Sequence, residues 1–283
     1  MAILSTPTMT PEGVANKYDE LDPFYRDIWG EHVHHGVWRT GKESDKEAAE
    51  SLVAMAAEAG QMTADTRVCD VGCGYGATAR ILAERSGAQV TGVTLSPVQH
   101  RFAEKHNAIP GKTSFVLGNW YENTFPDQSF DVVLSVESME HMPDLPAYFA
   151  EAWRLLKPGG RVVVCAWMSC ENPTPGQKRL LIDACCREGQ LAGIRPLSEF
   201  QKAVEGAGFT QFHNEDLSQQ VKRTWPLCAI RTLKGFFTNP AYIKFVFKPN
   251  NRNRTYIFML YRMWLGYNIG VMRYGVFSAV KAG

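Results

Sequence analysis

A doubly wound α/β fold with a mainly parallel sheet is predicted for this chain of 283 residues. Apolar strand patterns and helical patterns alternate at short spacing between residues 67 and 167, as in parallel sheets whose strands are joined by helices. A glycine-rich turn follows the first of these strands and leads directly into a helix. Crossovers between parallel strands are right-handed by default, so helices are expected on both faces of the sheet.

The element before the alternation is predicted from its cap and its periodicity. Ser44 can cap a helix, Glu47 follows three residues later, and apolar residues then recur at helical spacing until Gly60. This leading helix, within residues 44–60, should pack on the core. The short apolar run at 67–71 follows it and is the first predicted strand.

The remaining elements follow in order from the same patterns. Pro97 suits the first turn of a helix, because that position has no hydrogen-bond partner for a backbone N–H. In chain order we expect a helix at 77–87, a strand ending near Thr94, a helix at 97–108, strands at 113–120 and 130–137, a helix at 145–156, a turn at 157–160 and a strand at 161–167.

After Trp167 the rhythm changes, which suggests a division of labour along the chain. Residues 169–177 are rich in Pro and Gly and form a predicted loop, and residues 176–208 are predicted to be mostly helical. We therefore expect three segments of a Rossmann-like fold: an N-terminal segment with its leading helix (1–60), a core of alternating strands and helices (61–170), and a helical, aromatic segment with the closing strands (171–283). The resemblance described below implies that these segments serve as a lid, a cofactor-binding core and a substrate cap.

Composition excludes several classes of protein. A hydrophobic content of 45% is enough for a full core, and no window reaches 18 uninterrupted apolar residues, so no spanning helix is expected. The first ten residues lack the basic and apolar pattern of an export signal. Seven scattered cysteines predict a reducing compartment, hence the cytoplasm, and Cys69 and Cys73 lack the second pair of a zinc ribbon.

Charge is distributed unevenly along the chain. Residues 221–283 contain eleven Lys and Arg and no Asp or Glu, a net +11, which leaves −10 for the rest. Thirteen aromatic residues lie between Trp225 and Phe277. No nucleic-acid-binding module is recognisable. The interpretation favoured here is a hydrophobic substrate tunnel that opens at an anionic membrane surface. A basic surface or a homodimer contact against the acidic remainder is the alternative.

The glycine turn indicates a bound cofactor. Asp70, Gly72, Gly74 and Gly76 lie between a strand and a helix, where glycines let the backbone approach a ligand closely. The spacing is G-x-G-x-G, and an acid beside it is a poor neighbour for the pyrophosphate of a dinucleotide. A carboxylate suits a cationic ligand better. The alternatives are a tight βα turn without a ligand and a nicotinamide enzyme.

Together with KPGG at 157–160, these residues resemble the class I methyltransferases, whose cofactor S-adenosylmethionine carries a sulfonium and an amino group. The likeness narrows at WGEHVHHGVW, GVTLSPVQ, SVESMEHMPD, WPLCAIRT and YNIGVMRYGVFSAVK, which look like the tocopherol C-methyltransferase group, related to sterol and cyclopropane-forming mycolic acid methyltransferases. The resemblance implies methyl transfer to carbon of a small apolar aromatic or prenylated metabolite. Nitrogen or oxygen methylation of an indole, alkaloid or phenol, and a non-catalytic cofactor- or lipid-binding protein, remain alternatives.

The resemblance also implies roles for residues that match its motifs. The position usually held by an acid that grips the ribose is Thr94 here, followed by Leu95, and Asn119 stands where an adenine-contacting acid is usual. The expected cofactor-binding set is Tyr18, Trp29, His34, His35, Asp70, Gly72, Gly74, Thr94, Leu95, Gln99, Asn119, Trp120 and Glu137.

Two clusters are candidates for chemistry. His32, His34 and His35 are too close in sequence to converge easily on a metal, so no metal is expected and a lid over the cofactor is favoured over a packing role. Glu140 and His141 follow the fourth strand and are expected, with His35, to orient the acceptor and take its proton, because histidine ordinarily titrates near neutral pH. The alternative is that this stretch caps the helix near residue 145.

Overall fold

The computed structural model describes residues 10–248 and 255–283, which fold around one central sheet. The strands are ordered β3-β2-β1-β4-β5-β8-β7, and the short β6 pairs with β5. All neighbours are parallel except β8, which runs antiparallel to both β5 and β7. The strands are β1 (Arg67–Val71), β2 (Gln89–Thr94), β3 (Thr113–Leu117), β4 (Phe130–Val136), β5 (Leu156–Ser169), β6 (Arg195–Pro196), β7 (Phe209–Asp216) and β8 (Met272–Lys281).

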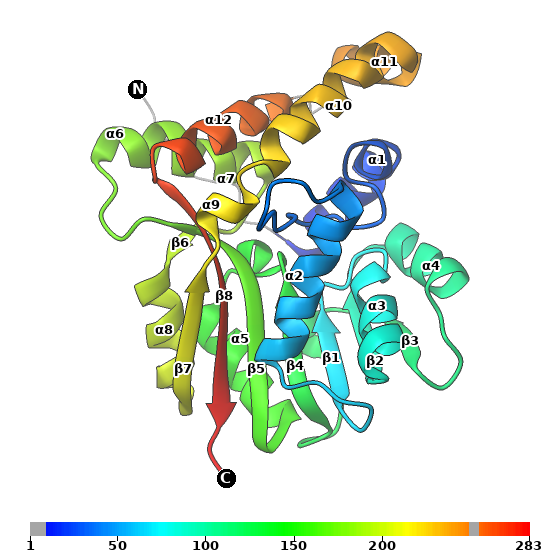
Figure 1. Ribbon diagram of the computed structural model, residues 1–283, viewed down its shortest axis with the longest axis vertical. Helices are drawn as coiled ribbons and strands as arrows, with labels where there is room; N and C mark the ends of the chain where they lie inside the picture. The colour runs from blue at the N-terminus through cyan, green and yellow to red at the C-terminus, as the bar shows by residue number, and fades with distance from the viewer. Residues whose placement is uncertain (1–9, 249–254) are drawn as a thin grey trace.

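Helices cover both faces of this sheet, as the predicted fold class requires (Figure 1). One face carries α2 (Asp45–Ala59), α3 (Ala77–Ser86) and α4 (Pro97–His106), and the other carries α5 (Leu145–Leu155) and α8 (Leu197–Gly206). Ser44 and Glu47 form the capping box that begins α2, as predicted.

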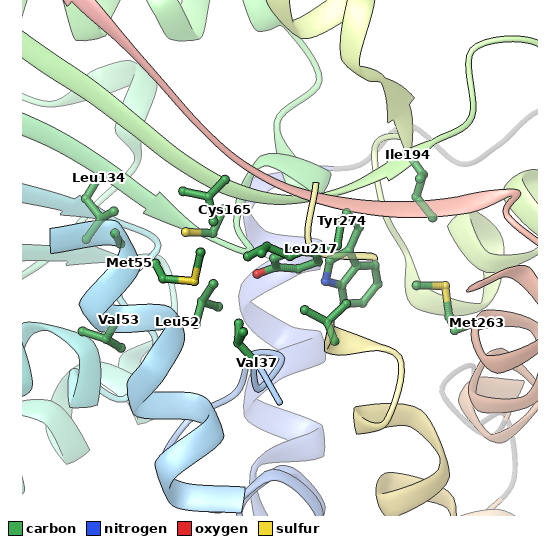
Figure 2. Packing of buried hydrophobic residues seen from close by; sticks show 14 of the residues in the cluster. Val37, Leu52, Val53, Met55, Leu134, Cys165, Ile194, Leu217, Met263 and Tyr274 are labelled. Atoms are coloured by element: carbon green, nitrogen blue, oxygen red, sulfur yellow. The ribbon is translucent and has the colours of Figure 1, made fainter. Parts of the chain in front are cut away.

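Strand β4 shows how the core divides into two layers. Val132 and Leu134 pack into the cluster that includes α2 and α3, whereas Val133, between them, packs against α5 and α8. Successive side chains of a strand point to opposite faces, so a strand covered on both sides must be apolar throughout. Leu52 and Met55 of α2 meet Leu134 and Cys165 in the first of these layers (Figure 2).

The last third of the chain differs in part from its prediction. Residues 176–208 are interrupted by β6, so only α6 (Pro175–Gln177), the π turn Lys178–Ile182, α7 (Asp183–Gly189) and α8 are helical. The predicted closing strands are β7 and β8. Between them lie α9 (Ser218–Val221), α10 (Thr224–Thr238), α11 (Pro240–Phe247) and α12 (Tyr256–Asn268). None of the described helices is long and apolar enough to cross a bilayer.

Helices from both ends of the chain gather at one end of the sheet, where the parallel strands terminate. Helix α1 (Pro11–Trp29) lies there beside α10, α11 and α12, while the C-terminus lies at the other end, after β8 (Figure 1). The loop between α1 and α2, which contains the histidine cluster, is on the same side. Ligands of doubly wound sheets bind at the carboxyl ends of the strands, so this arrangement places the N-terminal segment over the expected site.

Candidate functional site

Three adjoining cavities lie at the carboxyl ends of the parallel strands. We name them the main cavity (Gly74, Thr94, Gln99, Asn119 and Trp120 among its lining), the acidic recess (Asp70, His34, Gly72, Gly74) and the inner chamber (Lys17, Trp29, Glu140, Trp167). Val33 lines all three. Most of the site residues predicted from the sequence line at least one of these three cavities: Tyr18, Trp29, His34, Asp70, Gly72, Gly74, Thr94, Leu95, Gln99, Asn119, Trp120, Glu137, Glu140 and His141.

The glycine turn needs a residue without a side chain at Gly72 for steric reasons, and at Gly74 it leaves the backbone open to the cavity. Gly72 has φ +78°, and a Cβ there would stand 2.4 Å from the Cβ of Ser138. Ser138 cannot move aside easily, since its hydroxyl donates to the carbonyl of Val71 at 2.6 Å. Gly74 has φ +54°, yet a Cβ there would meet nothing closer than Gln99 at 3.9 Å, because it faces the cavity. The turn thus leaves room for a ligand.

Asp70 lies one residue before the end of strand β1 and carries a buried carboxylate, 1% exposed. Its Oδ2 has no hydrogen-bond partner among the described atoms, and burial raises its pKa to about 7. An ionised carboxylate without a partner is costly inside a protein, so the position calls for a hydrogen-bonded cation. The acidic recess beside it is where such a cation can enter.

The end of β2 is organised by side-chain hydrogen bonds rather than by an acid. The Thr94 hydroxyl donates to Oε1 of Gln99 at 3.0 Å, and both residues are buried. Ser96 caps α4 by accepting from the backbone N–H of Gln99, and its hydroxyl donates to Asp19 of α1. Helix α1 is therefore fastened to the rim of the main cavity.

Asn119 and Trp120, which follow strand β3, also line the main cavity. Oδ1 of Asn119 already accepts from the backbone N–H of Tyr121 at 3.2 Å, which caps a short 3₁₀ turn. This amide oxygen keeps a second lone pair for a ligand. Trp120 is buried against Tyr148, with ring centroids 5.1 Å apart.

The histidines of the N-terminal loop form a hydrogen-bonded chain. Nδ1 of His32 and Nε2 of His34 are 3.0 Å apart, and Nδ1 of His34 is 2.9 Å from the carbonyl of His35. Burial, followed by the neighbouring His34, lowers the pKa of His32 to about 3, and burial also lowers the pKa of His34. Among residues 10–248 and 255–283, no group of three or more His, Cys, Asp or Glu is arranged to hold a metal ion.

Glu137 joins this loop to the core. It accepts hydrogen bonds from the backbone N–H and Nδ1 of His35 at 2.7 and 2.9 Å, from Nε1 of Trp167 at 2.7 Å and from the hydroxyl of Tyr274 at 2.8 Å. Burial raises its pKa, but the charge and hydrogen bonds of His35 outweigh this and the net shift is downward. Glu137 is itself in the left-handed region, with φ +52°, so its carboxylate is held under backbone strain.

His35 lies behind Glu137 and not in the lining of the three cavities. Its side chain is 0% exposed, and its ring is packed among the rings of Trp167, Trp225 and Tyr274. This geometry favours a positioning role for His35 over direct contact with a substrate. His34, in contrast, lines the acidic recess.

Glu140 and His141 face the inner chamber from a 3₁₀ turn. Oε1 of Glu140 accepts from the backbone N–H of Trp167 at 2.5 Å, while Oε2 has no partner among the described atoms. Burial, followed by the charge of Glu137, raises the pKa of Glu140 to about 8. This stretch does cap α5, as the alternative prediction held, because the carboxylate of Asp144 accepts from the backbone N–H of Ala147 at 2.9 Å. The cap is Asp144, and neither Glu140 nor His141 takes part in it.

His141 does not titrate in its ordinary range. Burial and then the charge of Lys17 lower its pKa well below 6.5, so the near-neutral value assumed from the sequence is wrong. Its Nε2 is 2.9 Å from the hydroxyl of Tyr18, which also lines both the main cavity and the inner chamber. The pair joins helix α1 to the turn after β4.

Sequence reasoning missed several residues of this site. Lys17 is 4% exposed, donates through Nζ to the carbonyl of Gly189, and has its pKa lowered to about 7 by burial. Asp22 accepts from the hydroxyl of Tyr75 at 2.7 Å and so ties α1 to the glycine turn. Lys17 and Asp22 lie in an amphipathic helix where such residues are ordinarily solvated, so no local pattern distinguishes them.

These observations fit the cofactor that the sequence implied. Oδ2 of the buried Asp70, which has no partner among the described residues, suits a cationic amino group. The open face at Gly74 lets a ligand approach the backbone, and Thr94, Gln99 and Asn119 supply hydrogen-bonding groups along the main cavity.

Comparison with known proteins supports the same assignment. The family model for the methyltransferase domain matches residues 69–164. A probable chloroplastic tocopherol O-methyltransferase from Oryza sativa subsp. japonica is 36% identical over 241 residues, covering 78% of this chain and 66% of that protein. The 27-O-demethylrifamycin SV methyltransferase of Amycolatopsis mediterranei is 30% identical over 226 residues, covering 78% and 82%.

A solved structure shares the fold over almost the whole chain. Mycolic acid cyclopropane synthase CmaA1, in complex with SAH and CTAB, superimposes with a TM-score of 0.84 at 20% identity, covering 96% of this chain and 99% of that one. With the matching family model and relatives, this shows that the chain belongs to the class I S-adenosylmethionine-dependent methyltransferases.

Proposed function

We propose that this methyltransferase acts on a small, apolar, phenol-type ring that carries a prenyl chain, and that it methylates a ring carbon. The inner chamber carries the proposal. It adjoins the main cavity through Tyr18, Glu137 and His141, and its wall combines aromatic side chains with Lys17 and Glu140. The tocopherol named in the rice relative is itself a ring of this class.

The cofactor would bind with its amino group at Asp70, its ribose near Thr94 and Gln99, and its adenine beside Asn119. When bound, S-adenosylmethionine supplies an electrophilic methyl group on a sulfonium. Alignment and the exclusion of water account for most of the catalysis of such a displacement. Helix α1 and the histidine loop would serve as the lid, because Asp19, Asp22 and Glu137 fasten them to the core.

Glu140 is our candidate for the base. Its Oε2 has no partner in the part of the chain that the structure describes, and its raised pKa of about 8 makes it a stronger base than an ordinary carboxylate. It would accept the hydroxyl proton of the acceptor, which leaves a phenolate whose negative charge is shared with the neighbouring ring carbon. The Tyr18–His141 pair would orient the hydroxyl by hydrogen bonding. That carbon would be the nucleophile toward the methyl group that the bound cofactor supplies, and the cofactor would leave as the neutral thioether. The hydrogen on that carbon would then leave as a proton, which restores the aromatic ring, while the ring oxygen takes back the proton held by Glu140, so that one proton in total is released to water.

Oxygen is the second candidate for the target atom, because a phenolate can react at either atom and both relatives are named as O-methylating enzymes. The test is incubation with isotopically labelled methyl donor and, separately, a prenylated hydroquinone, a prenyl diphosphate and an indole. Labelled product from the hydroquinone, located on carbon by NMR, is expected. Product only from the indole or the diphosphate would reject this acceptor class, and no product despite cofactor binding would favour a non-catalytic protein.

The surface of α10, α11 and α12, in the basic segment 221–283, suggests where the enzyme would take up such an acceptor. Exposed apolar and aromatic side chains occur along α10, α11 and α12 beside the exposed Lys234 and Lys244: these are Ile230, Leu233, Phe237, Ile243, Phe247, Phe258, Tyr261 and Trp264. We propose peripheral contact of this face with an anionic membrane. Arg252 and Arg254, which are among the eleven basic residues of segment 221–283, lie outside the described residues.

Sedimentation with phosphatidylserine vesicles should retain the protein in low salt and release it in high salt. Phe237→Glu should abolish retention without changing cofactor affinity. A concentration-dependent dimer that Phe237→Glu disrupts, without vesicle binding, would instead show that this face contacts a second copy of the chain.

A further inference from the structure

A fourth cavity, the apolar cavity, lies between α1 and the helices of the cap. Leu21, Phe24 and Ile28 line it from α1, and Phe236, Phe245 and Leu260 line it from α10, α11 and α12. In Figure 1, α10, α11 and α12 lie at the top of the molecule, and α1 lies just below α11.

The lining offers almost nothing for a polar ligand. The hydroxyl of Thr232, which reaches the wall, donates to the carbonyl of Cys228 at 2.8 Å and is therefore satisfied within its own helix. No charged side chain belongs to the described lining. A site of this kind favours hydrocarbon, since binding a charged or strongly polar group would leave that group unpaired.

Tyr25 connects this cavity to the site of reaction, because it lines both the apolar cavity and the inner chamber. It stacks on Tyr18, with ring centroids 5.5 Å apart. Two consecutive residues of α12 line different cavities: Met259 lines the inner chamber, and Leu260 lines the apolar cavity. The inner chamber and the apolar cavity therefore share a wall at Tyr25.

We propose that the apolar cavity binds the hydrocarbon chain of the same acceptor whose ring occupies the inner chamber, with Tyr25 at the junction between ring and chain. This assignment rests on the proposed function and adds the determinant of chain specificity. The cavity lies toward the exposed apolar face, since Ile257 lines it and is 40% exposed. The chain would accordingly enter from this exposed apolar face.

The test uses 1,4-hydroquinones with a methyl, a decyl or an eicosyl chain, titrated into the protein with S-adenosylhomocysteine present. Burial of each methylene is worth up to about fourfold in affinity. Wild-type Kd should therefore fall steeply from methyl to decyl and level off once the cavity is full. Leu21→Trp, which fills the cavity, should weaken decyl binding at least about tenfold while leaving the Kd of the methyl compound and of S-adenosylhomocysteine unchanged.

A matched control and a second variant keep the result interpretable. Leu180→Trp adds the same ring at a residue that is 54% exposed in the π turn Lys178–Ile182, outside the residues proposed for membrane contact, and should change no Kd. Phe236→Ala enlarges the cavity and should shift the preference toward the eicosyl compound. Equal binding of the decyl compound by wild type and a folded Leu21→Trp, or no dependence on chain length in wild type, would overturn the inference. Chain-dependent binding without methyl transfer would instead reject only the proposed function.

Discussion

Replacement of Asp70 by asparagine is the sharpest test of the cofactor site. The change keeps the shape of the side chain and removes its charge. A charge-assisted hydrogen bond contributes about 1.5–3 kcal/mol, so the variant should bind S-adenosylhomocysteine roughly 10- to 100-fold more weakly than wild type. Asp65→Asn, an exposed position before β1, is the matched control and should bind like wild type.

The pH dependence gives the same test a second, independent readout. Burial moves the pKa of Asp70 from 3.8 to about 7, which corresponds to about 4 kcal/mol against ionisation. The ionised form binds the cation, so wild-type affinity should rise roughly tenfold from about pH 6 to about pH 8. The Asp70→Asn variant supplies the baseline for groups of the ligand that titrate in this range.

Calorimetry across this pH range measures both the affinity for S-adenosylhomocysteine and the stability of the folded protein. In the absence of ligand, wild-type stability should fall between about pH 4 and about pH 7, because the folded state holds a proton that the unfolded state has lost. The variant should lack this decline. If Asp70→Asn retained wild-type affinity together with the same rise with pH, Asp70 would not hold the cation and the assignment of the acidic recess would be wrong.

Three further predictions concern the turns after β1 and β4. Glu140→Gln should lower kcat at least about 100-fold and should remove the rise in rate that wild type shows through about pH 8. The same variant should be more stable than wild type at about pH 8, because the raised pKa of Glu140 means that ionisation of this carboxyl destabilises the folded state. An unchanged pH–rate profile would exclude Glu140 as the base. Glu137→Gln should lower Tm by roughly 5–10 °C, because the acceptor of several charge-assisted hydrogen bonds is lost. Wild type should lose stability as the pH falls below about 4.5, because the pKa of Glu137 is lowered in the folded state, and the variant should not show this loss. Melting curves of the variant that match those of wild type across acid pH would contradict this role. Gly72→Ala should destabilise the fold through its contact with Ser138, whereas Gly74→Ala should mainly weaken cofactor binding; equal melting temperatures for the two variants would refute this distinction.

The amino-acid sequence alone determined the architecture of the core. Strand and helix periodicity reflects which faces are buried, and burial repeats locally every two or 3.6 residues, so β1 to β5 and the intervening helices follow from short windows. The turn after β1 was equally local, because the need for left-handed backbone and close approach selects glycine at Gly72 and Gly76.

Only the tertiary structure decided which residues meet in the inner chamber and what state they are in. Tyr274 reaches Glu137 across 137 positions because β8 enters the sheet beside β5, and Lys17 enters the chamber because α1 folds across the strand ends. The displaced pKa values of His141 and Glu140 have the same origin. Desolvation depends on everything packed around a group, and those neighbours come from parts of the chain far apart in sequence.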